Sequence, residues 1–174
     1  MTVLQVLALH PYKLGSFEEY ILAFSETMHE RGHGVVYVFR GEPHPFISEK
    51  LRALGHQYFI QPDPKGPLEF AGFIKRLVGI IRKHRVDIIQ AQFFPHSNFA
   101  VLAGFLTRTP VYQTIHTLST LNPGPVRPVS KIKSRVSALM SEKIFAVSDA
   151  VRKDLVEVYG VQPEKIEVLF NAVS

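Results

Sequence analysis

Cysteine is absent from this chain, which excludes disulfides and thiolate metal sites. No apolar run approaches the ~20 residues that a membrane-spanning helix needs. Residues 1–9 lack the basic leader of a signal peptide and run directly into a strand-like pattern. These absences favour a cytoplasmic protein. The 174 residues, 46% of them hydrophobic, are enough for one globular domain with a sizeable core.

Positive charge is concentrated in one part of the chain. Residues 108–153 carry eight lysines or arginines and two acidic residues, whereas the net charge of the whole chain is +5. The remainder is therefore near neutral. A local basic field indicates an anionic partner such as phosphate, a lipid headgroup or nucleic acid, unless it is simply a solvated surface.

Apolar runs typical of buried strands alternate with segments of helical periodicity. Strands are predicted at 3–9, 35–39, 57–60, 86–91, 111–115, 143–147 and 166–170. Helices are predicted at 17–31, 48–54, 70–81, 97–106, 129–140 and 149–160, with Ser97 or Asn98 capping the fourth and Ser148 the last. This order predicts an α/β, Rossmann-like, doubly wound and mostly parallel sheet of about seven strands, with helices on both faces and a single domain over 1–174.

The string "HERGH" at residues 29–33 matches the H-E-x-x-H motif of zinc peptidases. That motif needs both histidines on one helix, four positions apart. Here Gly32, Gly34 and the strand at 35–39 predict a helix that ends near Arg31, with Gly32 as its left-handed cap. His33 then lies beyond the helix, and we expect no metal site.

Ligands of such sheets bind outside the carboxyl ends of the strands, so the loops that follow each strand carry the candidate sites. After the first strand, Gly15 and Ser16 lead into a helix, and a helix N-terminus suits an anion. The dinucleotide and Walker glycine spacings are both missing. The segment is therefore either a weak phosphate loop or an ordinary turn between strand and helix.

Polar side chains end two further strands. Gln90 and Gln92 lie on the same side of one strand end, where their amides can donate and accept hydrogen bonds but do not take up or release a proton near neutral pH. They could equally form hydrogen bonds with backbone groups of the neighbouring loops. His116 ends another strand and is followed by Thr117. It is either placed for polar contact or proton transfer, or it is structural.

A basic segment combines Arg127, Lys131, Lys133 and Arg135 with an apolar stripe at helical spacing. Such a helix could lie against an anionic membrane surface. Alternatively, the stripe packs on the core and the basic face is solvated. The residues leave both readings open.

Taken in chain order, several segments resemble one known family. They are "GSFEEY", "ERGHGVVYVF", "VDIIQAQFF", "PVYQTIHT", "EKIFAVSDAVRKDL" and "GVQPEKIEVLFNAVS". Together they are similar to the N-terminal domain of family-4 glycosyltransferases, which have the GT-B fold. The resemblance covers essentially the whole chain, and its last two segments are its most specific.

The resemblance implies transfer of a sugar from a nucleotide-sugar donor to an acceptor, with retention at the anomeric carbon and without a metal or other cofactor. It implies that backbone around Gly15 and Ser16 approaches the donor diphosphate and that His116 is the catalytic candidate beside the transferred sugar. The basic stretch from Arg127 to Arg135 favours an anionic or membrane-borne acceptor and peripheral contact with the inner face of a membrane, and nucleic acid is not expected as a partner. The candidate acceptor contacts are Tyr12, Lys13, Gln92, Asn98 and Thr117.

The chain also departs from the family pattern at several positions, and these departures have expected consequences. Ser16 replaces a second glycine, which crowds the approach of backbone to phosphate. Glutamines at 90 and 92 stand where the family has histidines, and Ala172 and Ser174 replace Gly and Asp. The donor-binding C-terminal domain of the family is not in this chain. We therefore expect a fragment that is inactive by itself.

Two other functions remain in competition. The first is half of a sugar-nucleotide epimerase, which needs carboxylates and histidines in its cleft for proton transfer. The Gln-x-Gln strand end counts against it. The second is a non-catalytic module that binds a phosphorylated sugar or a protein. Sequence beyond residue 174 would discriminate these readings, because transfer requires a second Rossmann-like domain with two glutamates eight positions apart.

Overall fold

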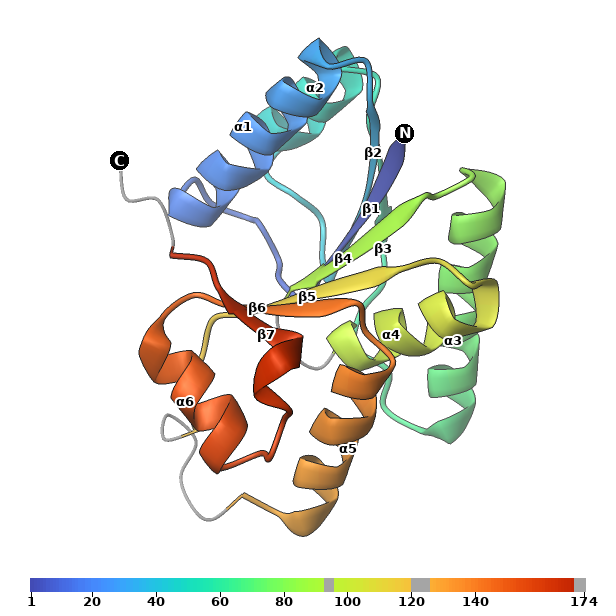
Figure 1. The fold of residues 1–174 in the computed structure, drawn as a ribbon. Coiled ribbons are helices and arrows are strands. Elements are labelled where there is room, and N and C mark those ends of the chain that lie inside the picture. The colour runs from blue at the N-terminus through green and yellow to red at the C-terminus, as the bar shows by residue number, and fades with distance from the viewer. Residues whose placement is uncertain (93–95, 120–125, 171–174) are drawn as a thin grey trace.

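A computed structural model describes residues 1–92, 96–119 and 126–170 (Figure 1). Its seven strands form one sheet in the order β3-β2-β1-β4-β5-β6-β7, and every neighbouring pair is parallel. The predicted fold class is confirmed. The strands are β1 (Thr2–Leu7), β2 (Gly34–Phe39), β3 (Gln57–Ile60), β4 (Ile88–Gln92), β5 (Val111–Ile115), β6 (Lys143–Ala146) and β7 (Ile166–Val168).

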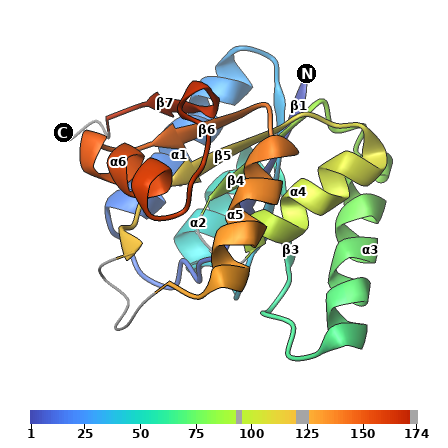
Figure 2. The same ribbon diagram turned by 60° about the horizontal axis from the view of Figure 1, so that its bottom comes forward.

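Helices cover both faces of this sheet, as Figures 1 and 2 show. One face packs against α1 (Ser16–Glu30) and α2 (Pro45–Ala53), and the other against α3 (Pro67–Lys83), α4 (His96–Thr107), α5 (Pro128–Leu139) and α6 (Asp149–Glu157). The strands β1 and β2 are buried on both sides because alternate residues enter different cores. In β1, for example, Leu4 and Val6 face the α3–α4 side, whereas Val3 and Leu7 face α1.

The "HERGH" string is a helix terminus followed by a turn. Helix α1 ends at Glu30, and Gly32 adopts φ +69°. The amide N–H groups of Gly32 and His33 donate to the carbonyls of His29 and Met28, at 2.9 and 2.8 Å. This is the hydrogen-bond pattern of a glycine-terminated helix. The predicted ending near Arg31 is confirmed, and the Nδ1 of His29 is engaged with the carbonyl of Leu54 at 3.0 Å.

Several predicted boundaries were wrong. Helix α2 begins at Pro45 rather than residue 48, because the Nδ1 of His44 accepts the amide N–H of Phe46 and Pro45 suits a first helical position. Helix α4 already includes His96, so neither Ser97 nor Asn98 is its N-cap. Strand β4 begins at Ile88, two residues later than predicted, because the amide N–H of Val86 still donates to the carbonyl of Ile81 in α3. Strand β7 ends at Val168.

The apolar stripe of α5 faces outward. Val129, Ile132, Val136 and Leu139 are 58, 61, 48 and 61% exposed. The alternative that this stripe packs on the core is therefore wrong, and only Met140, just after the helix, packs against the sheet. The inward positions of α5 are instead small residues, including the buried Ser137 and Ala138. Within the described ranges, no helix is long and apolar enough to cross a membrane.

Candidate functional site

The strand order reverses direction between β1 and β4. The chain leaves β1 toward β2 on one side and leaves β4 toward β5 on the other. The carboxyl ends of these two strands lie level, with Leu7 beside Gln92. Loops leave this point in opposite directions, which is where open α/β sheets bind ligands. The start of α1, Gln92 and His116 come together here.

The N-terminus of α1 faces this end of the sheet. Gly15 is the N-cap in an extended conformation, and no side chain caps the helix. The Gly15 carbonyl accepts the amide of Glu19 at 2.9 Å, while the exposed Ser16 begins the helix. The carboxylate of Glu18 lies 3.2 Å from where a Cβ on residue 15 would be, so a glycine keeps this turn open. The backbone N–H groups of a first helical turn and the helix dipole make such a turn suitable for an anion.

A buried amide network crosses the sheet beneath α1. Gln5 Nε2 donates to Gln90 Oε1 at 2.7 Å, and Gln92 Nε2 donates to Gln5 Oε1 at 3.4 Å. Gln90 Nε2 reaches Thr114 Oγ1 on β5 at 3.4 Å. The hydroxyl of Tyr20 on α1 accepts from Gln92 at 3.2 Å and from Gln5 at 3.5 Å. The predicted same-side placement of Gln90 and Gln92 is confirmed, and their amides connect three strands and a helix.

His116 is attached to this network. Its Nε2 lies 3.0 Å from Gln92 Oε1, and Phe17 of α1 packs edge-on against the ring with centroids 6.2 Å apart. Burial lowers the pKa of His116, so the neutral imidazole is favoured. Since the Gln92 oxygen can only accept, Nε2 carries the proton and Nδ1 is the acceptor nitrogen of the neutral ring. The network thus fixes one tautomer and one orientation.

The loop that carries His116 is anchored from α6. Asp154 accepts the backbone N–H of Ser119 at 2.9 Å and its hydroxyl at 2.5 Å. Sequence reasoning missed this contact, because the two residues are separated by 35 positions and nothing in the local pattern pairs them. Sequence reasoning likewise missed Gln5 and Tyr20, which fall within the predicted strand 3–9 and the predicted helix 17–31.

The candidate acceptor residues divide into exposed and buried groups. Tyr12 is 62% exposed with the Nζ of Lys13 5.9 Å from its ring centroid, and Thr117 is also exposed. Gln92, by contrast, is only 2% exposed and its amide is occupied by the network. Asn98 lies in the first turn of α4 with a buried Oδ1 that has no hydrogen-bond partner. The contact that best fits Gln92 is therefore with His116.

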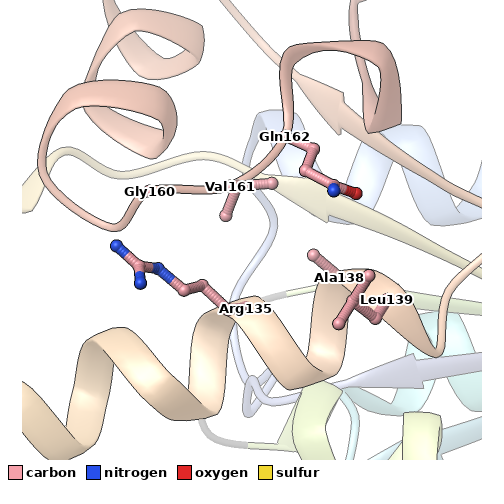
Figure 3. Close-up of a pocket in the computed structure, with 6 residues that line it drawn as sticks. All are labelled: Arg135, Ala138, Leu139, Gly160, Val161 and Gln162. Atoms are coloured by element: carbon pink, nitrogen blue, oxygen red, sulfur yellow. The ribbon is translucent and has the colours of Figure 1, made fainter.

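The basic side chains lie elsewhere. Lys131, Lys133 and Arg135 belong to α5, with Arg127 as its N-cap residue, on the face of the sheet opposite α1. Arg135 lines a cavity of about 160 Å³ between α5 and the turn after α6, shown in Figure 3. Its Nε donates to the carbonyl of Tyr159 at 3.0 Å.

Comparison with known proteins now assigns a family. The family model described as Glycosyltransferase Family 4 matches residues 17–174. The chain belongs to glycosyltransferase family 4. A sequence search of curated proteins finds no match.

Solved structures share the fold of this family-4 chain. A glycosyltransferase from Rickettsia africae matches with a TM-score of 0.79 at 23% identity, over 99% of this chain and 43% of that one. The Anabaena protein HepE, solved with UDP, matches with a TM-score of 0.70 at 16% identity, over 99% and 44%. WaaB, a lipopolysaccharide outer core galactosyltransferase, matches with a TM-score of 0.72 at 13% identity, over 100% and 46%.

These matches identify the sheet as one half of a GT-B fold. The chain spans less than half the length of the solved structures that it matches. Epimerases of sugar nucleotides share the same half, for example one from Listeria monocytogenes with a TM-score of 0.63 at 14% identity over 95% of this chain and 43% of that one. The architecture alone therefore does not distinguish transfer from epimerisation, whereas the family match does favour transfer.

Proposed function

We propose that this chain is the acceptor-side half of a retaining glycosyltransferase that takes a hexosyl group from a nucleotide-sugar donor. Family membership supports the reaction class. Structures solved with UDP and with UDP-glucose, and a galactosyltransferase, share the fold and support the donor class. The donor-binding half lies outside this chain, so we expect the chain by itself to be inactive. No metal or other cofactor is required in this proposal.

The observation that carries the proposal is the oriented His116 at the point where the strand order reverses. A neutral imidazole held by Gln92 can lie beside the transferred sugar without adding charge next to the anomeric carbon. Positive charge there would oppose the oxocarbenium character that glycosyl transfer develops. Burial keeps the ring neutral, and Gln92 keeps it oriented.

The other candidate residues have supporting roles in this proposal. Backbone N–H groups at Gly15 and Ser16 face the donor diphosphate from the start of α1. Tyr12, Lys13 and Thr117 offer exposed polar groups to the acceptor. The amide oxygen of Asn98 is buried, so Asn98 is the weakest of these candidates. We propose that the acceptor is anionic or membrane-borne and that the protein is cytoplasmic, with peripheral contact to an anionic membrane through the basic α5.

Replacement of His116 by Ala tests the catalytic assignment. The assay needs a protein in which this chain is joined to its donor-binding domain, with release of the nucleotide as the readout. We expect the turnover of His116→Ala to fall by about two orders of magnitude or more. His33→Ala, which changes a histidine in the turn after α1, is the matched control and should leave the rate unchanged. Equal rates for both variants would refute the role of His116.

An epimerase remains the second candidate, because two epimerases share this half-fold, each with a TM-score of 0.63. The two reactions differ in their need for an acceptor. A transferase releases nucleotide only when sugar is transferred to an acceptor or water, whereas an epimerase changes the configuration of the sugar and leaves the donor intact. An epimerised nucleotide sugar formed without acceptor would favour the second candidate.

A further inference from the structure

In helix α5 the apolar and polar sides are exchanged relative to an ordinary surface helix. A helix on a sheet normally turns apolar residues inward and polar residues outward. In α5 the inward side is rich in serine, and the buried Gln113 of β5 donates from Nε2 to the hydroxyls of Ser137 and Ser141 at 3.1 and 2.8 Å. The outward side carries Val129, Ile132 and Val136. The packing of residues 1–92, 96–119 and 126–170 therefore does not explain this stripe.

Helix α4 extends the stripe. It packs beside α5 on the same face of the sheet, and both views show the two helices as neighbours (Figures 1 and 2). Its outward residues Leu102, Phe105 and Leu106 are 38, 64 and 53% exposed. A cluster of exposed apolar side chains on adjacent helices marks an interaction surface. We define the α4–α5 apolar surface as Leu102, Phe105, Leu106, Val129, Ile132, Val136 and Leu139.

Helices α4 and α5 themselves contain no acidic residue. No aspartate or glutamate occurs between Asp87 and Glu142 in the sequence. In contrast, Arg108 directly follows α4, and Lys131 and Lys133 fall on opposite flanks of the α5 stripe, two positions apart on the helix. A partner for this surface must therefore accept both apolar side chains and a rim of positive charge.

Arg135 marks the edge of the surface on the α6 side. Its guanidinium is held by the carbonyl of Tyr159 and lies against Gly160, which adopts φ +67°. In Figure 3 the side chain points from α5 toward this turn, while Leu139 lies one helical turn further along. A Cβ at residue 160 would come within 2.7 Å of the guanidinium Cζ, so the glycine leaves room for the Arg135 side chain. The charged rim is thus preorganised on this side.

We propose that the α4–α5 apolar surface inserts into the headgroup region of an anionic bilayer. The inference deepens the proposed membrane contact by naming the side chains that enter the lipid, and it requires no transfer chemistry. Helices that lie in a membrane interface combine a stripe of large apolar residues with flanking lysine and arginine. Anionic lipid attracts each such cation. The exposed Arg108 and Lys133 beside the apolar side chains favour an anionic lipid surface over an uncharged apolar partner.

The absence of tryptophan from the chain permits a direct test. Val136→Trp places a single fluorescent reporter on α5, and Phe46→Trp places one on α2, at a side chain of similar exposure on the opposite face (42% against 48%). With vesicles of equal parts phosphatidylglycerol and phosphatidylcholine, we expect the emission of the α5 reporter to shift to shorter wavelength. The α2 reporter should not shift, and neither should respond to pure phosphatidylcholine.

Affinity measured by vesicle sedimentation separates apolar from electrostatic contributions. Ile132→Glu should weaken binding by about tenfold or more, since it removes a large inserted side chain. Lys133→Ser should weaken binding by about fivefold. Phe46→Glu changes the net charge as Ile132→Glu does, yet should leave affinity within about twofold of the unaltered chain, because a distant surface charge is largely screened at physiological salt.

Three outcomes would overturn the inference. Binding to anionic vesicles without a shift of the α5 reporter would mean electrostatic contact without insertion. A reporter already shifted in buffer, with a dimer mass in sedimentation equilibrium, would assign the surface to a second copy of the chain. No binding at all would remove the membrane contact. None of these results bears on sugar transfer, which is measured separately with soluble substrates.

Discussion

Two glycines within helices should respond in opposite directions to the same substitution. Gly104 lies in α4 where the helix touches the sheet, and a Cβ there would overlap Val111 Cγ2. It would also come within 2.8 Å of the Thr109 carbonyl oxygen and 3.3 Å of Ile89 Cδ1. Gly79 lies in α3 with nothing within 4 Å of its Cβ position. Gly79→Ala is therefore a matched control for Gly104→Ala.

The size of each effect follows from two opposing contributions. Alanine is favoured over glycine within a helix by ~1 kcal/mol, which should appear undiminished as a gain in the free energy of unfolding at position 79. At position 104 the same gain is opposed by overpacking, which costs ~1–3 kcal/mol or more. One of the crowded atoms is a backbone carbonyl that cannot rotate away. We therefore expect Gly104→Ala to lose ~1–2 kcal/mol and the two variants to differ by ~2–3 kcal/mol.

Urea unfolding followed by circular dichroism measures both variants against the unaltered chain. A change of 1 kcal/mol corresponds to ~2–4 °C in melting temperature for a chain of this length, so a thermal scan provides an independent check. If Gly104→Ala were as stable as Gly79→Ala, the close packing of α4 on β4 and β5 would be wrong. The attachment of the α4–α5 apolar surface to the sheet would then need revision.

Two further predictions concern the loop after β5. NMR titration should place the pKa of His116 below its ordinary value of 6.5, and Phe17→Ser should raise it by admitting water. A lowered pKa means that the unfolded chain binds the proton at a higher pH than the folded chain does. The contribution of His116 to stability is therefore present above about pH 6.5 and is lost as pH falls through the folded pKa. A measured pKa at or above 6.5 would contradict the burial of His116. Asp154→Ala should cost ~1–3 kcal/mol and speed amide exchange at Ser119. Glu157→Ala, which removes an exposed ion pair at 3.9 Å, should cost less than ~0.5 kcal/mol.

Most of the fold could be predicted from periodicity, because local patterns determine it. Buried strands such as 35–39 are continuous apolar runs, and Gly32 ends α1 where the apolar period lapses. Ser148 caps α6 as predicted, with its hydroxyl accepting the Val151 amide at 3.2 Å. Boundaries were less predictable. The start of α2 depends on a histidine cap, and histidine is uncommon in that role.

The site could be predicted only in part. Its location after β1, β4 and β5 follows from the general rule for parallel sheets. The partners of His116 do not, because hydrogen bonds between Gln5, Gln92 and Tyr20 join segments that are far apart in sequence. The outward direction of the α5 stripe was also not determined by the sequence. A helical stripe fixes which residues share a face, but the register of the helix on the sheet fixes which way that face points.

The amide network has a consequence for how the site responds to acidity. Gln5, Gln90, Gln92 and Thr114 carry no titrating group, and burial raises the pKa of Tyr20 above its ordinary value of 10. Near neutral pH, the support of His116 therefore keeps a constant charge while the imidazole itself gains or loses a proton. The glutamines at the strand end thus surround one histidine with side chains that do not titrate. A family relative with histidines at those two positions would instead have three interacting imidazoles, and its acid response would belong to the group rather than to a single ring.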